Sequence, residues 1–195
     1  PKLSLNEIME GLSLQLITYL LALSKTKDTK DLLPAAMMYI YLHGRPKSIS
    51  VPPNGIPHAK EKENTNGIFL NDPDVLRTLD SQSGTDDGFI GVSYVKDGSV
   101  KKTSPILTAE QFEALKALTE KILIRLYSRL ESGEIAIHPV KNGMLSPCSY
   151  CPYRSICRFD PALPENSFDY ISKVSDKTIR EKLDEEMKRN GKENL

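Results

Sequence analysis

Cys148, Cys151 and Cys157 are the only cysteines of this 195-residue chain, and they fall within a span of ten residues. Three cysteines cannot all pair with one another in disulfides. An odd, clustered set is typical of metal or iron–sulfur chemistry in a reducing compartment, and not of a secreted disulfide scaffold. Two thiolates separated by two residues can bind one metal centre, because the turn between them directs both sulfurs inward. The cysteines therefore predict a cytoplasmic protein with a metal centre near the end of the chain.

The residues around the cysteines leave three interpretations open. In an iron–sulfur site, Tyr150, Tyr153 and Phe159 would supply an apolar shell. A structural zinc site needs four protein ligands, and His138 is the candidate for the fourth. Three buried free thiols would instead behave as small hydrophobic residues. No Cys or His follows Cys157, so a site without His138 needs a ligand from outside the chain.

The composition indicates one domain of ordinary hydrophobicity. Hydrophobic residues make up 39% and charged residues 27%, and 26 Lys and Arg balance 26 Asp and Glu. Zero net charge argues against a uniformly basic nucleic-acid binder but is compatible with a local basic face. No apolar run is long enough to span a membrane, and no secretory signal opens the chain. Because the chain begins without Met, we expect it to be a piece of a longer protein.

A long, well-buried helix is predicted over residues 5–24, where apolar residues recur at helical spacing. Its start carries a capping box, with Ser4 as N-cap and Glu7 reaching back to it. Leu3 and Ile8 stand where a hydrophobic staple would place them.

A second long helix is predicted over residues 108–130, with an apolar stripe along its whole length. Thr108 and Gln111 form its capping box, and Gly133 marks its C-terminal end. A charged helix that buries one edge is predicted over residues 175–195.

The region between the two long helices predicts strands and loops. Residues 35–42 form a short apolar run that predicts a buried strand. Residues 44–88 are rich in Pro and Gly, and they predict a loop-rich insertion with at most a short helix near 74–79. A hairpin that turns at Asp97-Gly98 is predicted over residues 89–103. Together the elements predict an α/β fold in which long helices flank a mixed sheet.

Two motifs together resemble a known family. The segment GLSLQLITYL, residues 11–20, places Gln15 and Tyr19 on one helical face. A Gln-x-x-x-Tyr pair alone is a weak signal. Joined to PCSYCPYRSICRFD at residues 147–160, however, it is similar to the C-terminal nuclease domain of AddB-type subunits of bacterial helicase–nucleases. Those domains belong to the RecB-like branch of the PD-(D/E)XK nuclease superfamily.

This resemblance implies a fold and a cofactor. It identifies residues 1–160 as the back part of a restriction-endonuclease-like core, which includes a cysteine segment at 138–160. Residues 161–195 are then a charged C-terminal extension. The three cysteines are implied to bind a 4Fe–4S cluster whose fourth cysteine lies far upstream, and the cluster's role is structural with support for DNA binding.

The resemblance also implies Mg²⁺-dependent hydrolysis of DNA phosphodiesters, in which Gln15 and Tyr19 orient the metal ligands and the scissile strand. The family's Asp and Asp-x-Lys motifs normally lie on two strands before this helix, a region that would precede Pro1. Asp28-Thr29-Lys30 and Glu186-Met187-Lys188 match the pattern but follow no apolar strand, so we interpret both as solvated charge. We therefore expect the chain alone not to cleave DNA.

The implied partners are DNA and an AddA-type helicase–nuclease subunit. The chain has no phosphate-binding Gly-x4-Gly-Lys-Ser/Thr motif, so the ATP motor must lie elsewhere. Lys141, Arg154 and Arg158 lie in a segment without acids and are candidate phosphate contacts, although an ordinary surface also fits them. Exposed edges of an incomplete sheet predict self-association. Two alternatives remain: a CRISPR-adaptation-type Fe–S exonuclease, disfavoured by the insertion at 44–88, and a non-enzymatic zinc-binding interaction module.

Overall fold

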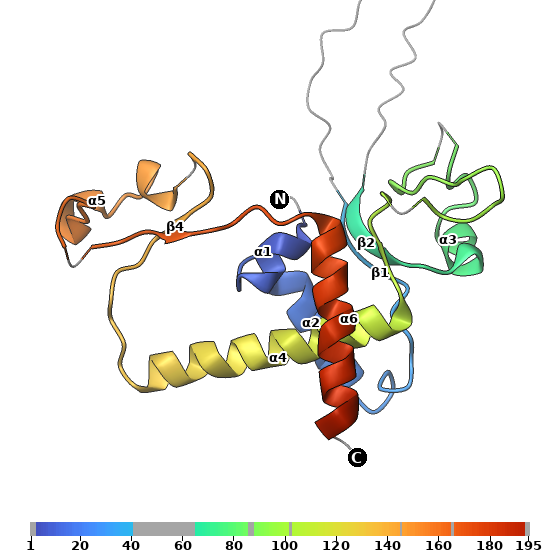
Figure 1. The fold of residues 1–195 in the computed structure, drawn as a ribbon, viewed down its shortest axis with the longest axis horizontal. Coiled ribbons are helices and arrows are strands. Elements are labelled where there is room, and N and C mark those ends of the chain that lie inside the picture. Colours follow the sequence, from blue (N-terminus) through green and yellow to red (C-terminus); the bar gives the residue numbers. More distant parts are fainter. Residues whose placement is uncertain are drawn as a thin grey trace, which may run out of the picture.

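The computed structural model describes residues 3–40, 65–85, 88–101, 103–144, 146–164 and 166–193. Within these residues the fold is mixed α/β, with helices packed on a mixed sheet as predicted (Figure 1). The first elements are α1 (Leu5–Met9), α2 (Gln15–Ser24), β1 (Ala36–Tyr39), β2 (Asn66–Leu70), α3 (Pro73–Leu79) and β3 (Ile106–Leu107). They are followed by α4 (Ala109–Glu131), β4 (Val140–Lys141), η1 (Pro147–Ser149), α5 (Arg154–Cys157), β5 (Asp169–Tyr170) and α6 (Asp176–Glu193).

A three-stranded sheet in the order β1-β2-β3 lies at the centre of the fold. β1 and β2 are antiparallel, with Ala36 opposite Phe69, and β2 and β3 are parallel, with Phe69 opposite Ile106. Gly67 permits the close approach of β1 to β2, because a Cβ atom there would lie 2.6 Å from Cβ of Met38. The sheet is therefore mixed, and its central strand is β2.

The interpretation of residues 44–88 as an insertion of loops is wrong in part, because β2 lies within it. The apolar run that forms β2 spans only residues 68–70, and the Pro and Gly residues around it concealed a buried strand. The short helix expected in the same region is confirmed as α3, and the strand expected at 35–42 is confirmed over β1. The rest of both predictions, residues 41–64, lies outside the described residues.

The single helix predicted over residues 5–24 is instead two helices, α1 and α2. Between them Gly11 has φ +81° and Ser13 has φ +51°. Left-handed backbone suits glycine just past a helix end, and it cannot continue a right-handed helix. Gly11 is therefore the stop signal that the apolar periodicity concealed.

The two predicted capping boxes have opposite outcomes. Ser4 makes no side-chain cap, and the Glu7 carboxylate accepts a hydrogen bond from the Ser13 hydroxyl at 2.8 Å, so the first prediction is wrong. The second is confirmed: the Thr108 hydroxyl accepts from the Gln111 N–H at 3.2 Å, and the Gln111 side chain accepts from the Thr108 N–H at 3.1 Å. α4 follows this box and ends just before Gly133, which has φ +71°.

Two apolar clusters lie on opposite faces of the sheet, because successive side chains of β2 point to opposite sides. The larger cluster joins the sheet to α1, α2, α4 and α6, and its fully buried side chains include Ile8, Ile17, Phe112, Leu115 and Leu183. The smaller cluster covers the other face and contains Phe69, Leu76, Ile90, Val92 and Ile106.

The predicted hairpin over residues 89–103 is confirmed as a tight turn but not as two full strands. Tyr94 and Val100 form an isolated antiparallel bridge. The Asp97 carboxylate accepts from the Ser99 N–H at 2.9 Å, and Gly98 has φ +85°. The local turn chemistry is therefore as expected, and the strands beyond it are short.

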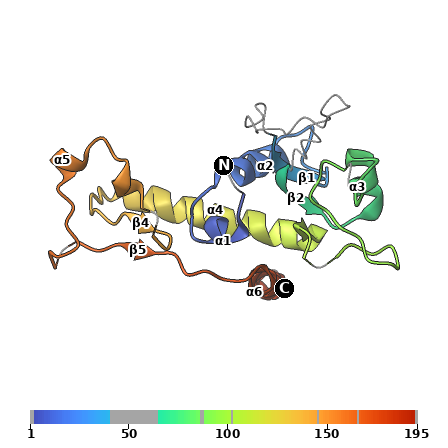
Figure 2. The same ribbon diagram turned by 90° about the horizontal axis from the view of Figure 1, so that it is seen from above.

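α6 crosses α4 and closes the larger cluster; it is seen end-on in Figure 2. The charged helix expected at residues 175–195 is thus confirmed, with Ile179 and Leu183 buried along one edge. The Gln111 side chain donates to the Asp184 carboxylate at 2.8 Å and adds a polar contact between the two helices. No helix in the described parts of the chain is long and apolar enough to cross a membrane.

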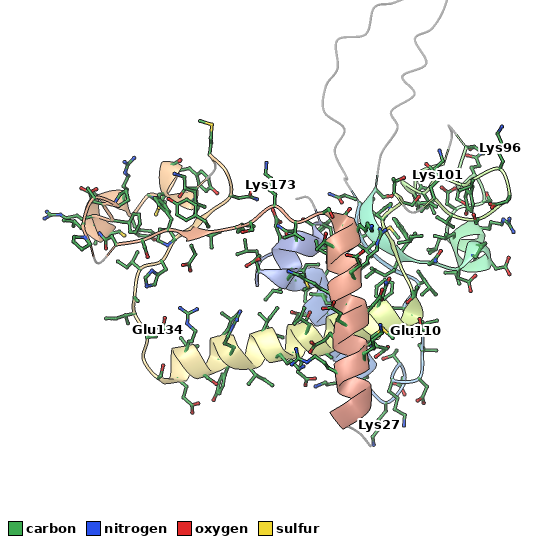
Figure 3. All side chains as sticks on the ribbon, viewed as in Figure 1. Lys27, Lys96, Lys101, Glu110, Glu134 and Lys173 are labelled. Atoms are coloured by element: carbon green, nitrogen blue, oxygen red, sulfur yellow. The ribbon has the colours of Figure 1, made fainter. Side chains whose placement is uncertain are left out.

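A small unit that contains the cysteines lies beyond the far end of α4 (Figures 1 and 2). We call residues 140–171 the cysteine unit. Glu134, just past α4, marks the start of the connection to it in Figure 3, and its carboxylate forms a two-point ion pair with the Arg129 guanidinium. This hydrogen bonding holds the pKa of Glu134 below its ordinary value. Among the described residues of the cysteine unit, only Ser146 is buried, and no hydrophobic side chain is.

Candidate functional site

The predicted Gln15–Tyr19 pair is assembled on α2. Gln15 is the first residue of the helix, and its Nε2 donates a hydrogen bond to Tyr19 Oη at 3.1 Å. Tyr19 is 57% exposed and Gln15 is exposed, whereas Ile17 on the opposite face is buried in the core. The geometry leaves the phenol O–H and the Gln15 Oε1 directed toward solvent, where a donor and an acceptor can act together on a ligand.

Short helical turns position the cysteines. Cys148 lies in η1, where the Ser146 hydroxyl caps the turn by accepting from the Cys148 N–H at 3.3 Å. Cys157 is the last residue of α5, which ends because Arg158 adopts a left-handed conformation with φ +50°. Cys151 lies between the two turns. The three thiols are therefore presented from two turns and the link between them.

All three thiols line one hollow of about 270 Å³, which we call the thiol hollow. Cys148 and Cys151 are half-buried and Cys157 is exposed. Among the described residues, no three His, Cys, Asp or Glu side chains lie close enough together to hold a metal ion. The thiols thus share a hollow without converging on one point. The other residues that line it are Lys141, Met144, Ser146, Ser149, Arg154, Phe159, Pro161 and Phe168.

The aromatic shell expected around the thiols is wrong for two of its three members. Tyr150 is 79% exposed and Tyr153 is 67% exposed, and neither lines the hollow. Phe159 does line it, and its ring packs edge-to-face on that of Phe168, with centroids 4.8 Å apart. Phe168 is not among the residues predicted from the sequence; the alternation of Phe168 and Tyr170 on a short strand is the signal that points to it.

The three candidate phosphate-binding residues separate into two groups. Lys141 and Arg154 line the thiol hollow, whereas Arg158 lies outside it and is exposed. The Lys141 ammonium lies over the Phe168 ring, 5.0 Å from its centroid, and 5.8 Å from that of Tyr170. No carboxylate is among the described residues that line the hollow, so its electrostatic environment is positive.

His138 does not join the thiols. Its Nδ1 lies 3.1 Å from the Ser167 hydroxyl, within hydrogen-bonding distance, and the ring does not line the thiol hollow. The described structure therefore does not assemble the zinc site that needs His138 as its fourth ligand.

The two Asp/Glu-x-Lys matches are not assembled into a metal site either. Asp28 and Lys30 lie exposed in the turns after α2, in agreement with solvated charge. Glu186 differs from that interpretation, since its carboxylate forms an ion pair with Lys121 and lies 3.4 Å from the Arg189 guanidinium. The hydrogen bond from Lys121 holds the pKa of Glu186 below its ordinary value. Glu186 is therefore a link between α4 and α6.

The chain matches known proteins along most of its length. A family model described as the PD-(D/E)XK nuclease superfamily matches residues 2–158, which include the Gln15–Tyr19 pair and all three cysteines. Proteins named as AddB-type subunits of an ATP-dependent helicase/deoxyribonuclease are also similar. The one from Desulforamulus reducens is 32% identical over 92% of the chain, that from Clostridium acetobutylicum 30% over 97%, and that from Bacillus subtilis 30% over 94%. The chain spans only 16% to 17% of the length of these relatives.

Proposed function

Because the chain belongs to the PD-(D/E)XK nuclease superfamily, we propose that it forms part of a metal-dependent DNA exonuclease domain in a bacterial helicase–nuclease. The names of its relatives, which describe an ATP-dependent helicase/deoxyribonuclease, support this choice. In this role the parent protein processes double-strand breaks for recombinational repair in the cytoplasm, on DNA and with an AddA-type partner. The observation that carries the proposal is the hydrogen-bonded Gln15–Tyr19 pair on an exposed helix face inside the matched region.

Gln15 and Tyr19 are the positioning residues of the proposed reaction. The Gln15 amide and the Tyr19 hydroxyl hold each other in place and offer a donor and an acceptor to the scissile strand or to the carboxylates around it. When bound, Mg²⁺ supplies an activated water and neutralises charge on the phosphoryl group. The Asp and Asp-x-Lys motifs expected to hold Mg²⁺ are not assembled among the described residues, so the isolated chain should be inactive.

The cysteine unit fits an iron–sulfur cluster as its crosslink. A unit of this size without a buried apolar side chain among its described residues needs a staple, and metals commonly serve as one. Cys148, Cys151 and Cys157 share one hollow with aromatic and basic walls and without a carboxylate among the described lining. A polynuclear cluster binds each thiolate at a separate iron, so its ligands need not converge on one point. We assign these three thiols as ligands of a 4Fe–4S cluster whose fourth ligand lies outside the chain.

The nuclease proposal is tested by changing the Gln15–Tyr19 pair in the intact protein that carries these residues, together with its partner. Tyr19→Phe and Gln15→Ala should each lower the Mg²⁺-dependent cleavage rate of linear duplex DNA by roughly 10-fold or more, as loss of an orienting partner commonly does. The ATPase rate should stay unchanged, because the ATP motor lies elsewhere. Tyr127→Phe is the matched control, since Tyr127 is 63% exposed on α4 and lies outside the motif.

Wild-type cleavage rates in both variants would contradict a role for the pair in the reaction. The isolated chain provides a second test, with Mg²⁺ or Mn²⁺ and the same DNA. Cleavage by residues 1–195 alone would overturn the expectation that the metal-binding motifs lie outside this chain.

A further inference from the structure

The strand that follows the cysteines returns to the strand that precedes them. β5 pairs in parallel with β4, so that Val140 lies opposite Asp169 and Lys141 lies opposite Tyr170. Backbone hydrogen bonds run from the Asp169 N–H to the Pro139 carbonyl at 3.1 Å and from the Ile171 N–H to the Lys141 carbonyl at 3.0 Å. This pairing encloses the cysteines in a loop and brings Phe168 to the wall of the thiol hollow.

Phe168 is the centre of the only ring-on-ring cluster among the described residues. Its ring contacts Phe159 at 4.8 Å and Tyr170 at 6.1 Å between centroids, both edge-to-face. Phe159 follows Cys157 by two residues, so the aromatic contact links the last thiol directly to β5. In a unit without a buried hydrophobic side chain in its described parts, this contact is the main apolar surface beside the thiols.

Lys141 completes the wall from the β4 side. Its ammonium is held over the Phe168 and Tyr170 rings, and the residue also lines the hollow. A cation over aromatic rings is partly desolvated and therefore acts at short range with less screening. A thiolate-ligated iron–sulfur centre is anionic, and charges and hydrogen bonds around it set its reduction potential.

We infer that Phe168 and Lys141 close the thiol hollow over the proposed cluster, and this inference rests on that cluster. Phe168 restricts the access of water and small solutes to the iron atoms, and Lys141 stabilises the more negative, reduced form of the centre. Both are positioning residues that act on the cluster from the returning strand pair. The candidate DNA contact at Lys141 is thereby reassigned to the cluster, whereas Arg158 keeps its outward position.

The test uses the intact protein with its partner, purified without oxygen and compared as wild type and variants. The first readout is the rate at which excess EDTA removes the visible iron–sulfur absorption under anaerobic conditions. Phe168→Ala should raise this rate by roughly 10-fold, the scale at which outer-shell residues commonly act on metal sites. Tyr153→Ala is the matched control, because Tyr153 lies in the same unit but outside the hollow, and its rate should equal that of wild type.

The second readout is the midpoint potential of the cluster, followed by electron paramagnetic resonance. Lys141→Met keeps the apolar stem over Phe168 and removes the charge, so the potential should shift to a more negative value. Arg158→Gln removes an equal charge outside the hollow and should shift it less. This measurement also serves if Phe168→Ala does not fold.

The outcomes separate the inference from the proposal beneath it. Wild-type protein that contains zinc or no metal, without iron and sulfide, would overturn the cluster and the inference together. Iron-loaded wild type with an unchanged EDTA rate in Phe168→Ala would overturn the role of Phe168. An equal shift of potential in Lys141→Met and Arg158→Gln would overturn the role of Lys141.

Discussion

The core and the cysteine unit lie toward opposite ends of the same helix, α4, and are stabilised in different ways (Figure 1). The N-terminal half of α4 buries Phe112, Leu115 and Ile122 against the sheet, α2 and α6. Its C-terminal half exposes Ile124 and Leu130, and the unit beyond it buries no hydrophobic side chain in its described parts. Burial of apolar surface therefore stabilises the core, whereas the cysteine unit depends on a short strand pair, an aromatic contact and, in our proposal, a metal crosslink.

The largest expected effect is in the core. Phe112→Ala removes a fully buried ring and should lower the free energy of unfolding by about 3–5 kcal/mol. Tyr127→Ala, on the exposed half of the same helix, should change it by no more than about 0.5 kcal/mol. Urea titration followed by circular dichroism measures both. Similar losses in the two variants would mean that the exposed half of α4 is as tightly packed as the buried half.

A second prediction concerns the cysteine unit. In the intact protein, Cys148→Ser should reduce iron content and make residues 140–171 more susceptible to limited proteolysis, because metal binding and folding of the unit are coupled. The bonds within α4 and α6 should stay as resistant as in wild type. Ser149→Ala, which changes a neighbouring residue of the hollow wall but no thiol, is the control. Faster cleavage throughout the core would show that the two regions do not unfold independently.

The smallest effect is predicted for the ion pair between α4 and α6. The folded-state pKa of Glu186 is lowered by its hydrogen bond from Lys121, so the pair stabilises the fold above the ordinary carboxyl pKa and loses this contribution as the pH falls through the folded-state value. Glu186→Gln should cost about 0.5 kcal/mol at neutral pH and progressively less in acid. Thermal unfolding at several pH values tests this, with the exposed neighbour in Glu185→Gln as control. A cost that does not depend on pH would exclude the ion pair as its cause.

Local signals in the sequence predicted the elements whose boundaries are set by neighbouring residues. The Thr108–Gln111 capping box and the turn at Asp97 are confirmed because the atoms that satisfy each other lie within three residues. The break at Gly11 is also local, but the apolar periodicity continues across it and hides it. The Gln15–Tyr19 contact follows from the helix itself, because residues four apart lie on one face.

Features that depend on distant pairing could not be predicted in the same way. β2 is a strand because β1 and β3 lie on either side of it, and its own sequence offers only a short apolar run between Pro and Gly residues. Phe168 reaches the thiol hollow because β5 pairs with β4, a contact that two-residue strands do not announce. The same holds for Glu186, whose partner Lys121 lies on another helix.

The crossing of α6 over the core also sets an order of events during synthesis. The Asn6 side chain donates to the Ser172 carbonyl at 2.9 Å, and α1 contributes Leu5 and Ile8 to the cluster that Ile179 and Leu183 complete. Residues near position 6 leave the ribosome long before those near position 180. The apolar surface of α1, α2 and α4 must therefore wait, uncovered, while the cysteine unit between them and α6 is translated. The nascent chain thus exposes a chaperone-binding surface until its last helix emerges.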